Sequence, residues 1–340
     1  MTLASARQQA WGAFDEIVAR TDLTDEASNP WRHDGAGGLV YEPDFATLRA
    51  LLGVPIALSA PSTSGVPALA LDVWVAHELR RAGFDADGVW PRGRPPRVLP
   101  APIANLLRGL PPDERDALLH KLGSRSAPKG VISSSAAILG KNYVKQVDVG
   151  ISDWMTGPEL LISTKRMDSS FGKNAANRVE ESYGDAKNLR LRYPLAGLGF
   201  LYGLRSTVFD SEPDTAAWLI DLLQKLGRED DAYDAVCLLV VDYRDVAPPL
   251  ELDDEDHGED ALRRALDPLE PTDADESVVE GSSIDEPVDV AHLPEVDLNL
   301  DIVPPDLQPS HFFKHLVEHV LSITPINFHV GARDRRASAR

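Results

Sequence analysis

The middle of the chain contains four short apolar stretches, and a longer, more polar stretch separates the second from the third. Strand-like patterns cover residues 147–151, 160–165, 195–204 and 235–243. Residues 174–190 instead place small or apolar side chains three and four positions apart, which is the spacing of a helix with one buried stripe. Strands that flank a helix in this order predict an α/β unit built around a sheet.

The first part of the chain has a helical pattern. The strongest predicted helix, residues 69–82, has the sequence LALDVWVAHELRRA and ends before Gly83. Its apolar positions predict that Glu78, Arg80 and Arg81 face solvent. Further helices are predicted at residues 4–20, 44–52, 131–139, 213–226 and 310–323. The sequence therefore predicts a mainly helical N-terminal region that leads into the α/β core.

These patterns divide the chain of 340 residues into four parts. Residues 1–125 form the helical N-terminal region, which is also a candidate for DNA contact, and residues 126–250 form the α/β core. Residues 251–303 are an acidic insertion of low order, and residues 304–340 are a C-terminal helix with a basic tail that we expect to be disordered.

The charge of the chain is concentrated in the acidic insertion. The whole chain carries a net charge of −20, but residues 251–303 contain 19 acidic side chains and 2 arginines. Residues 141–193, by contrast, contain 9 lysines or arginines and 7 acidic residues. Acidic blocks of this kind are usually solvated. The overall acidity therefore does not argue against a nucleic-acid site in the core.

Several classes of protein lack support in the sequence. Cys237 is the only cysteine, which excludes a disulfide or a cysteine-based zinc site within one chain. No apolar run reaches the 18 residues of a membrane helix, and the first residues lack the apolar core of a signal peptide. The motifs GxGxxG, GxSxG and the P-loop are also missing. We therefore expect a cytoplasmic protein without membrane contact.

Charged residues gather at the predicted end of two neighbouring strands. Asp148 lies in the first strand and Lys165 in the second, and the connection contains the turn residues Gly157 and Pro158. Adjacent antiparallel strands would place Asp148 and Lys165 side by side at a sheet end. Glu180 and Glu181 follow on the helix. Such carboxylates with a lysine can hold a divalent cation and a water, as phosphodiester cleavage requires.

This order of residues resembles the PD-(D/E)xK nuclease superfamily, typified by type II restriction endonucleases. In that family an Asp ends one strand and a (D/E)xK tripeptide lies in the next. Asp148 matches the Asp and Lys165 matches the Lys, but Ser163 stands where the second carboxylate is expected. The resemblance implies that Glu180 or Glu181 supplies the missing acid, with Glu180 favoured. Ser163 would then order a water, and Lys165 would stabilise developing charge.

The resemblance covers about residues 131–245 and implies a restriction-endonuclease-like mixed sheet flanked by helices. It implies a metal-dependent DNA endonuclease, active in restriction or defence, with Mg²⁺ or Mn²⁺ as cofactor. Double-stranded DNA is the implied partner, and a homodimer and a companion methyltransferase or defence subunits are compatible with it. Because one acid is missing, the alternative is an inactive DNA-binding or scaffold subunit of the same fold.

Candidate DNA contacts come from two segments that are rich in phosphate-binding side chains. The first segment follows the second strand and supplies Arg166, Lys173, Asn174, Asn177 and Arg178. The second is a proline-rich loop that carries Arg92, Arg94 and Arg97. For this loop, a stiff surface connection between helices is an equally good interpretation.

Each candidate also has an ordinary structural interpretation. Asp153, in the predicted turn, competes with Asp148 for the role of first carboxylate. The pair Lys165–Arg166 also fits a solvated strand edge, and Glu180, Glu181 and Lys187 also fit an exposed helix face. His311, His315 and His319 are spaced four apart, which suits a metal ion, although a histidine stripe beside the core is the favoured interpretation because no HExxH motif is present.

Overall fold

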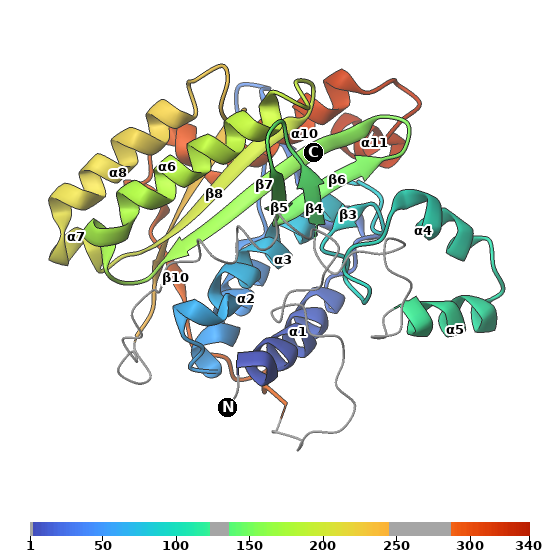
Figure 1. Cartoon of the computed structure of the whole chain (residues 1–340), viewed down its shortest axis with the longest axis horizontal. Helices are drawn as coiled ribbons and strands as arrows, with labels where there is room; N and C mark the ends of the chain where they lie inside the picture. Colours follow the sequence, from blue (N-terminus) through green and yellow to red (C-terminus); the bar gives the residue numbers. More distant parts are fainter. Residues whose placement is uncertain (1–2, 123–135, 245–286) are drawn as a thin grey trace.

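A six-stranded mixed sheet is the centre of the described part of the chain, which comprises residues 3–122, 136–244 and 287–340 of this computed structural model (Figure 1). The strand order is β10–β9–β8–β7–β6–β3. Strands β7, β8 and β9 are parallel to one another, and the other neighbours are antiparallel. These strands are β3 (Val89–Trp90), β6 (Val149–Asp153), β7 (Gly157–Met167), β8 (Gly197–Arg205), β9 (Ala235–Asp242) and β10 (Asp297–Leu298). The predicted α/β class with a mixed sheet is confirmed.

Helices cover both faces of this sheet (Figure 1). One face packs against α1 (Leu3–Ala19), α2 (Phe45–Ala57), α3 (Val66–Arg81) and α10 (Pro309–Ile323). The other packs against α6 (Phe171–Arg190) and α8 (Pro213–Leu226). The shorter helices are α4 (Ala101–Arg108), α5 (Pro112–Leu122), α7 (Val208–Ser211) and α11 (Val330–Ala337). Among the helices described, none is both long and apolar enough to cross a membrane.

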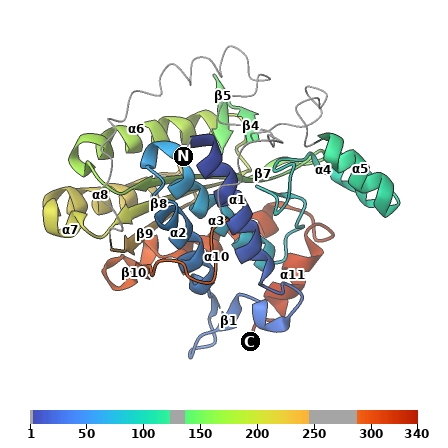
Figure 2. The ribbon, with the colours of Figure 1, turned by 90° about the horizontal axis from the view of Figure 1, so that it is seen from below.

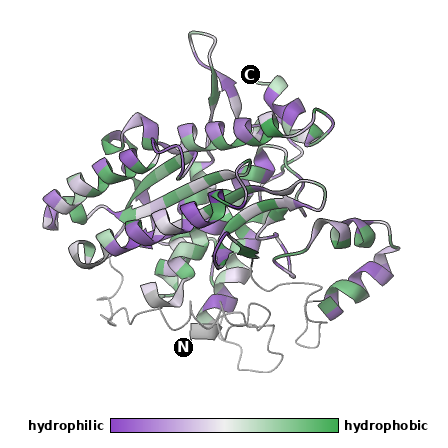
Figure 3. Ribbon diagram, turned by 45° about the horizontal axis from the view of Figure 1, so that its top comes forward, coloured by the Kyte–Doolittle hydropathy of each residue, from purple (hydrophilic) through white to green (hydrophobic). Residues whose placement is uncertain are grey.

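The central strand β7 is buried on both faces, which explains its nearly continuous apolar sequence. Leu160 and Ile162 join the core beneath α3 and α10, whereas Leu161 and Met167 join the core beneath α6 and α8. Figure 3 shows the central strands in the green of hydrophobic residues, with hydrophilic residues on the outer surfaces of the helices. The predicted strands in residues 195–204 and 235–243 are confirmed as β8 and β9, and the helix in residues 174–190 as α6.

The N-terminal helices share their core with the sheet. Leu71 and Trp74 of α3 belong to the same buried cluster as Ile162 of β7 and Phe313 of α10. A strand from the same region, β3, also forms the edge of the sheet beside β6. The boundary expected near residue 125 therefore does not separate two hydrophobic cores.

The exposure predicted for Glu78, Arg80 and Arg81 is wrong, because all three side chains are buried. Glu78 accepts hydrogen bonds from the Tyr41 hydroxyl at 3.0 Å and from the Asp44 amide at 2.7 Å, and it pairs with Arg81 at 2.7 Å. A buried charge is tolerated only when it is paired and hydrogen-bonded, and this network meets that requirement. It ties α3 to the small hairpin of β1 (Trp31–His33) and β2 (Leu39–Tyr41) and to the start of α2.

The helix predicted at residues 131–139 is also wrong for its described part. Residues 136–139 form β4 (Ala136–Leu139), which pairs in antiparallel fashion with β5 (Val144–Val147), and residues 131–135 lie outside the described residues. Asn188 of α6 fastens the turn between these strands, because its side chain accepts from the Asn142 amide at 2.8 Å and donates to the Tyr143 carbonyl at 3.0 Å. A short run of small and apolar residues fits a strand as well as a helix.

The end of the acidic segment and the basic tail both belong to the fold. Residues 251–286 lie outside the described residues, but Val296 and Val303 are buried, and β10 extends the sheet beside β9. The expected disorder of the tail is wrong, because residues 330–337 form α11 beside β1 (Figure 2). The Arg340 carbonyl accepts from the His33 amide at 2.6 Å, and Arg335 donates to the Arg81 carbonyl at 3.1 Å. Basic side chains here satisfy backbone carbonyls instead of remaining in solvent.

We predict that Glu78→Gln destabilises the protein by about 3–5 kcal/mol, because it leaves the buried Arg81 charge without its partner. The matched control is Glu318→Gln, which breaks a solvent-exposed pair with Arg336 and should cost less than about 1 kcal/mol. Urea unfolding followed by circular dichroism measures both. Equal losses of stability in the two variants would contradict the role assigned to the Glu78 network.

Candidate functional site

The candidate site lies where β5, β6 and β7 meet. Asp148 occupies the junction between β5 and β6, directly after the last residue of β5 and before the first residue of β6. Val149 pairs with Ile162 in the antiparallel β6–β7 ladder, which brings Asp148 beside the next residues of β7. The Thr164 amide donates a hydrogen bond to Asp148 Oδ2 at 2.8 Å. The β6–β7 hairpin therefore places Asp148 at the end of the sheet where Lys165 also lies.

A second carboxylate reaches the same residue from α3. Thr164 points from β7 toward α3, as Leu160 and Ile162 do, and its hydroxyl donates a short hydrogen bond to Asp72 Oδ1. Thr164 thus holds Asp148 with its backbone N–H and Asp72 with its side-chain O–H. One residue of the central strand fixes two carboxylates that come from different parts of the sequence.

Burial makes this pair of carboxylates electrostatically unfavourable. Burial, and then the charge of Asp148, raise the pKa of Asp72 well above its usual value. Burial likewise raises the pKa of Asp148, although the positive charge of Lys165 and the Thr164 N–H oppose the effect. Two carboxylates that resist ionisation side by side are stabilised by a shared proton or by a cation. The pair is therefore chemically suited to bind a positive ion.

A group of charges on the α6 face borders the pair. Lys165 points toward α6, where its ammonium lies 3.9 Å from Glu181. Lys145 of β5 lies 3.8 Å from the same carboxylate and also pairs with Asp185, while Arg178 lies 3.8 Å from Glu181. Glu181 is therefore surrounded by three cationic side chains.

The structure distinguishes between the two glutamates proposed from sequence. Both glutamates are exposed, but Glu181 lies in the charge group beside Lys165, whereas Glu180, at the preceding position of α6, is not part of that group. Successive helix residues point about 100° apart, so only one of the two can face the sheet end. The preference for Glu180 over Glu181 is not supported by this geometry. Glu181 itself contacts two lysines and an arginine.

The other predicted catalytic candidates differ in their surroundings. Ser163 is buried within the central strand, so its hydroxyl lies in the core and not at the open sheet end. Asp153 lies in the hairpin turn, where its carboxylate accepts from the Met155 amide at 2.8 Å. It is five residues further along the strand than Asp148, roughly 17 Å away. Asp153 therefore does not compete with Asp148 for this site.

The predicted DNA contacts are only partly available. Arg92 is buried and pairs with Asp87 at 2.6 Å, and Arg97 pairs with Asp15 at 2.8 Å, so in this structure both guanidinium groups are engaged within the protein. Of the three loop arginines, Arg94 alone is exposed. The two pairs hold the proline-rich loop to the protein, which corresponds to the structural interpretation of this loop.

The second candidate DNA segment is partly described. Asn177 is exposed and Arg178 is partly exposed on α6, close to Glu181. Arg166 is buried between Asp168, at 3.1 Å, and the ring of Tyr243. The side chains of Lys173 and Asn174 lie outside the described residues.

Sequence reasoning missed Asp72, Lys145 and Asp185. The signal for Asp72 was present, because an acidic residue stood among the apolar positions of the strongest predicted helix. An unexplained charge on a buried helix face often marks a functional group. Lys145 and Asp185 had no comparable signal, since each resembles an ordinary exposed charge until the strands are paired.

We next consider which side chains of the described residues could bind a metal ion. In the described ranges, no group of three or more His, Cys, Asp or Glu side chains is placed to hold a metal ion. On α10 the rings of His311 and His315 stack at 5.9 Å, while His319 is hydrogen-bonded to the Leu195 carbonyl at 3.0 Å. The histidines therefore do not converge on one point. A cation at Asp72 and Asp148 would have these two carboxylates and the Thr164 hydroxyl as its protein oxygens.

Comparisons of this chain with models of known protein families, with curated proteins and with solved structures find no significant match. The candidate site therefore rests on its own geometry and electrostatics.

Proposed function

We propose that this chain is a divalent-cation-dependent nuclease that hydrolyses phosphodiester bonds in double-stranded DNA. The observation that carries the proposal is the pair Asp72 and Asp148, which Thr164 holds together next to Lys165. The connection from hairpin to helix to parallel strand, β6–β7–α6–β8, also fits the restriction-endonuclease-like resemblance. A homodimer and companion methyltransferase or defence subunits stay predictions.

The residues at the pair fit Mg²⁺ or Mn²⁺. These ions prefer oxygen ligands, and Mg²⁺ is often held by one or two carboxylates together with substrate phosphates and waters. The raised pKa values of Asp72 and Asp148 supply an independent reason, because a cation would offset the repulsion between two buried carboxylates. Three protein carboxylates are therefore not required.

Each residue of the site would have a separate role in phosphodiester hydrolysis. A bound divalent ion neutralises charge on a phosphate and makes water more acidic. Asp72 and Asp148 hold that ion, and the two hydrogen bonds from Thr164 keep their carboxylates in place. Lys165 brings positive charge toward the developing negative charge of the phosphate. Its distance of 3.9 Å from Glu181 is loose enough for Lys165 to exchange that partner for a phosphate oxygen.

A second candidate is an inactive DNA-binding or scaffold protein of the same fold. Two observations favour it. Ser163 is buried where the family pattern has a carboxylate, and Lys165 is already engaged with Glu181. The two candidates differ in one measurable property, which is cation-dependent cleavage.

The decisive assay incubates supercoiled plasmid with the purified full chain in Mg²⁺, in Mn²⁺ and in EDTA. We expect nicked or linear products with either ion and none in EDTA. Plasmid that stays intact under all conditions, but is retained by the protein at low salt, would support the scaffold candidate and reject the nuclease.

We predict that Lys165→Ala abolishes cleavage while it leaves the affinity for DNA within about tenfold, since one phosphate contact among many contributes little to binding. The matched control is Lys225→Ala, which removes an exposed lysine paired with Asp221 on α8. Cleavage is followed on plasmid, and binding by fluorescence anisotropy in Ca²⁺. Full cleavage by the Lys165→Ala protein would reject the role of this lysine.

We predict that Asp72→Asn raises the stability of the metal-free protein at pH 7. The pKa of Asp72 is higher in the folded than in the unfolded state, so ionisation favours unfolding as the pH rises above its usual value. Asparagine removes this penalty and still accepts the hydrogen bond from Thr164. The melting temperature in EDTA should therefore rise for this variant and should change little for the exposed control Asp221→Asn.

The same variant separates a cation site from a structural carboxylate pair. Mg²⁺ or Mn²⁺ should raise the melting temperature of the unaltered protein, because a ligand that binds only the folded state stabilises it. Asp72→Asn should lose most of that increase. An unchanged response to the cations would show that Asp72 does not bind them.

A further inference from the structure

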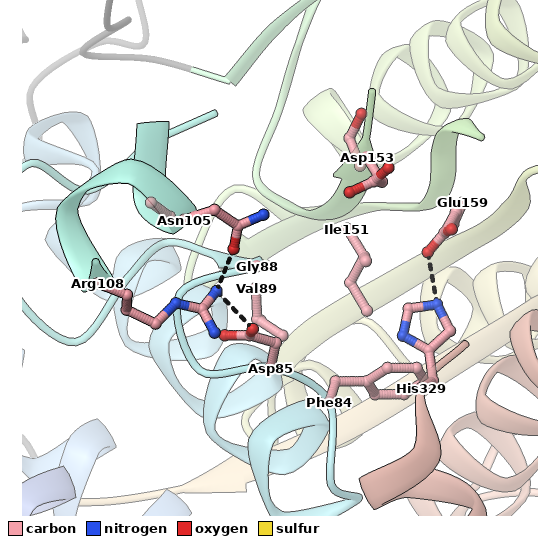
Figure 4. A pocket seen from close by; sticks show the side chains of 12 residues that line it. Phe84, Asp85, Gly88, Val89, Asn105, Arg108, Ile151, Asp153, Glu159 and His329 are labelled. Atoms are coloured by element: carbon pink, nitrogen blue, oxygen red, sulfur yellow. Dashed lines mark hydrogen bonds and ion pairs between the residues drawn. The ribbon is translucent and has the colours of Figure 1, made fainter. Parts of the chain in front are cut away.

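A pocket lies at the turn end of the β6–β7 hairpin, away from Asp148. It opens between the hairpin turn, α4 and the start of α11, and its volume is about 110 Å³ (Figure 4). Pockets for cofactors and drug-sized ligands usually measure about 300–1,000 Å³. This pocket is therefore too small for such a molecule but large enough for the end of one long side chain.

The walls of this pocket combine an apolar floor with an acidic side. Phe84, Val89 and Ile151 line the floor, and all three are buried. Asp153 stands at the hairpin turn, where its carboxylate accepts a hydrogen bond from the Met155 amide at 2.8 Å. An occupant with an apolar stem and a positive end would match both surfaces.

Glu159 and His329 form a hydrogen-bonded dyad on one wall. Glu159 is 1% exposed, and it accepts from Thr156 Oγ1 at 2.6 Å and from His329 Nε2 at 2.8 Å. Burial raises the pKa of Glu159, but these two hydrogen bonds outweigh burial and lower the pKa below its usual value. The carboxylate is therefore ionised, and an ionised carboxylate only accepts hydrogen bonds. His329 therefore carries a proton on Nε2, and in the neutral imidazole Nδ1 is then an acceptor.

The free nitrogen of His329 faces the pocket. Figure 4 shows Nε2 of the ring turned toward Glu159 and the other nitrogen turned toward the space beside Phe84 and Val89. The ring of Phe84 packs edge-on against His329 at 5.0 Å. His329 also has a left-handed backbone with φ of 51°, which is uncommon outside glycine and often marks a functional position. The ring is thus held between Glu159 and Phe84, and its neutral form presents an acceptor to an N–H donor in the pocket.

The one arginine on the opposite wall does not cancel this preference. Arg108 donates to Asp85 at 2.8 Å and to the Asn105 side chain at 2.9 Å, so its charge is already paired (Figure 4). The charge of Glu159 is shared with its two donors. The carboxylate of Asp153 therefore makes the balance at the mouth of the pocket negative.

Apolar side chains project into solvent from two turns that lie next in the sequence to the pocket residues Asp153 and His329. In the described ranges, the three most exposed large hydrophobic side chains are Trp154 at 86%, Ile326 at 85% and Met155 at 77%. Trp154 and Met155 form the hairpin turn beside Thr156, and Ile326 lies three residues before His329. The Glu159–His329 dyad joins these two turns. Exposed hydrophobic residues around a small pocket are typical of a protein interface with a central anchor.

We propose that this end of the sheet docks a polypeptide partner that inserts a lysine or arginine side chain into the pocket. The aliphatic stem would lie on Phe84, Val89 and Ile151. The charged end would donate to His329 Nδ1 and to the carboxylate of Asp153. Apolar residues beside the inserted side chain would cover Trp154 and Met155. This docking surface is independent of the proposed nuclease activity.

The test uses three blocked tripeptides as probes: acetyl-Leu-Lys-Leu-amide, its norleucine counterpart and its glutamate counterpart. Binding to the full chain is followed by NMR chemical shifts of the Trp154 indole and the Gly88 amide, which report on the rim and the floor. We expect saturable shifts at both positions for the lysine peptide. Its affinity should exceed that of the norleucine peptide by about tenfold or more, because hydrogen bonds to a charged group distinguish the two.

Two variants locate the charge that is recognised. Asp153→Asn should weaken binding of the lysine peptide about fivefold or more, while Asp297→Asn, at an exposed carboxylate on β10, should leave it unchanged. DNA cleavage should be unaffected by both variants. Equal binding of the norleucine peptide, or no shift with any of the three peptides, would overturn the proposal. Trp154-dependent sedimentation with phosphatidylserine vesicles, without peptide binding, would assign the surface to a membrane instead.

Discussion

Thr164 is the residue on which the arrangement of the candidate site depends. Its backbone N–H binds Asp148, and its hydroxyl binds Asp72, so a single position of the central strand joins the β5–β6 junction to α3. Burial of β7 on both faces makes that position rigid, because Leu161 and Ile162 are fixed in the cores on opposite sides of the sheet. Two carboxylates are thereby held in a place where neither ionises easily. Such a site stores an unfavourable interaction that a cation can relieve.

Positive charges on the α6 side of the sheet reduce the electrostatic cost of burying Asp72 and Asp148 together. Lys145 and Lys165 lie close to the carboxylate pair, and both lower the pKa of Asp148 against the effect of burial. Glu181 and Asp185 hold these lysines in turn through ion pairs. The ammonium groups of Lys145 and Lys165 on the α6 side could therefore move toward a bound phosphate. Ion pairs of Lys145 and Lys165 with Glu181 and Asp185 would also occur in an inactive scaffold. The pair Asp72 and Asp148 is therefore stronger evidence for a nuclease than Lys165 is.

The sequence pattern was sufficient to predict four elements, because α6 and α8 each bury one face, and β8 and β9 are nearly continuous apolar runs buried on both faces. It also predicted that Asp148 and Lys165 meet at one end of the sheet. It failed where charges are buried in networks, since Glu78 and Arg81 look exposed until Tyr41 and the α2 N-terminus supply their partners. Asp72 was missed for a related reason, because its partner Thr164 is 92 residues away in the sequence. The basic tail was misjudged because its arginines bind distant backbone carbonyls, which no local pattern reveals.

The central claim is that Asp72 and Asp148 hold a divalent cation, and anomalous X-ray diffraction from crystals soaked in Mn²⁺ tests it most directly. Mn²⁺ scatters anomalously and accepts the same oxygen ligands as Mg²⁺. The account predicts one strong peak within bonding distance of both carboxylates, together with rearrangement of the Thr164 hydroxyl away from Asp72. A map with no peak between Asp72 and Asp148, or with Mn²⁺ bound only elsewhere on the chain, would contradict it.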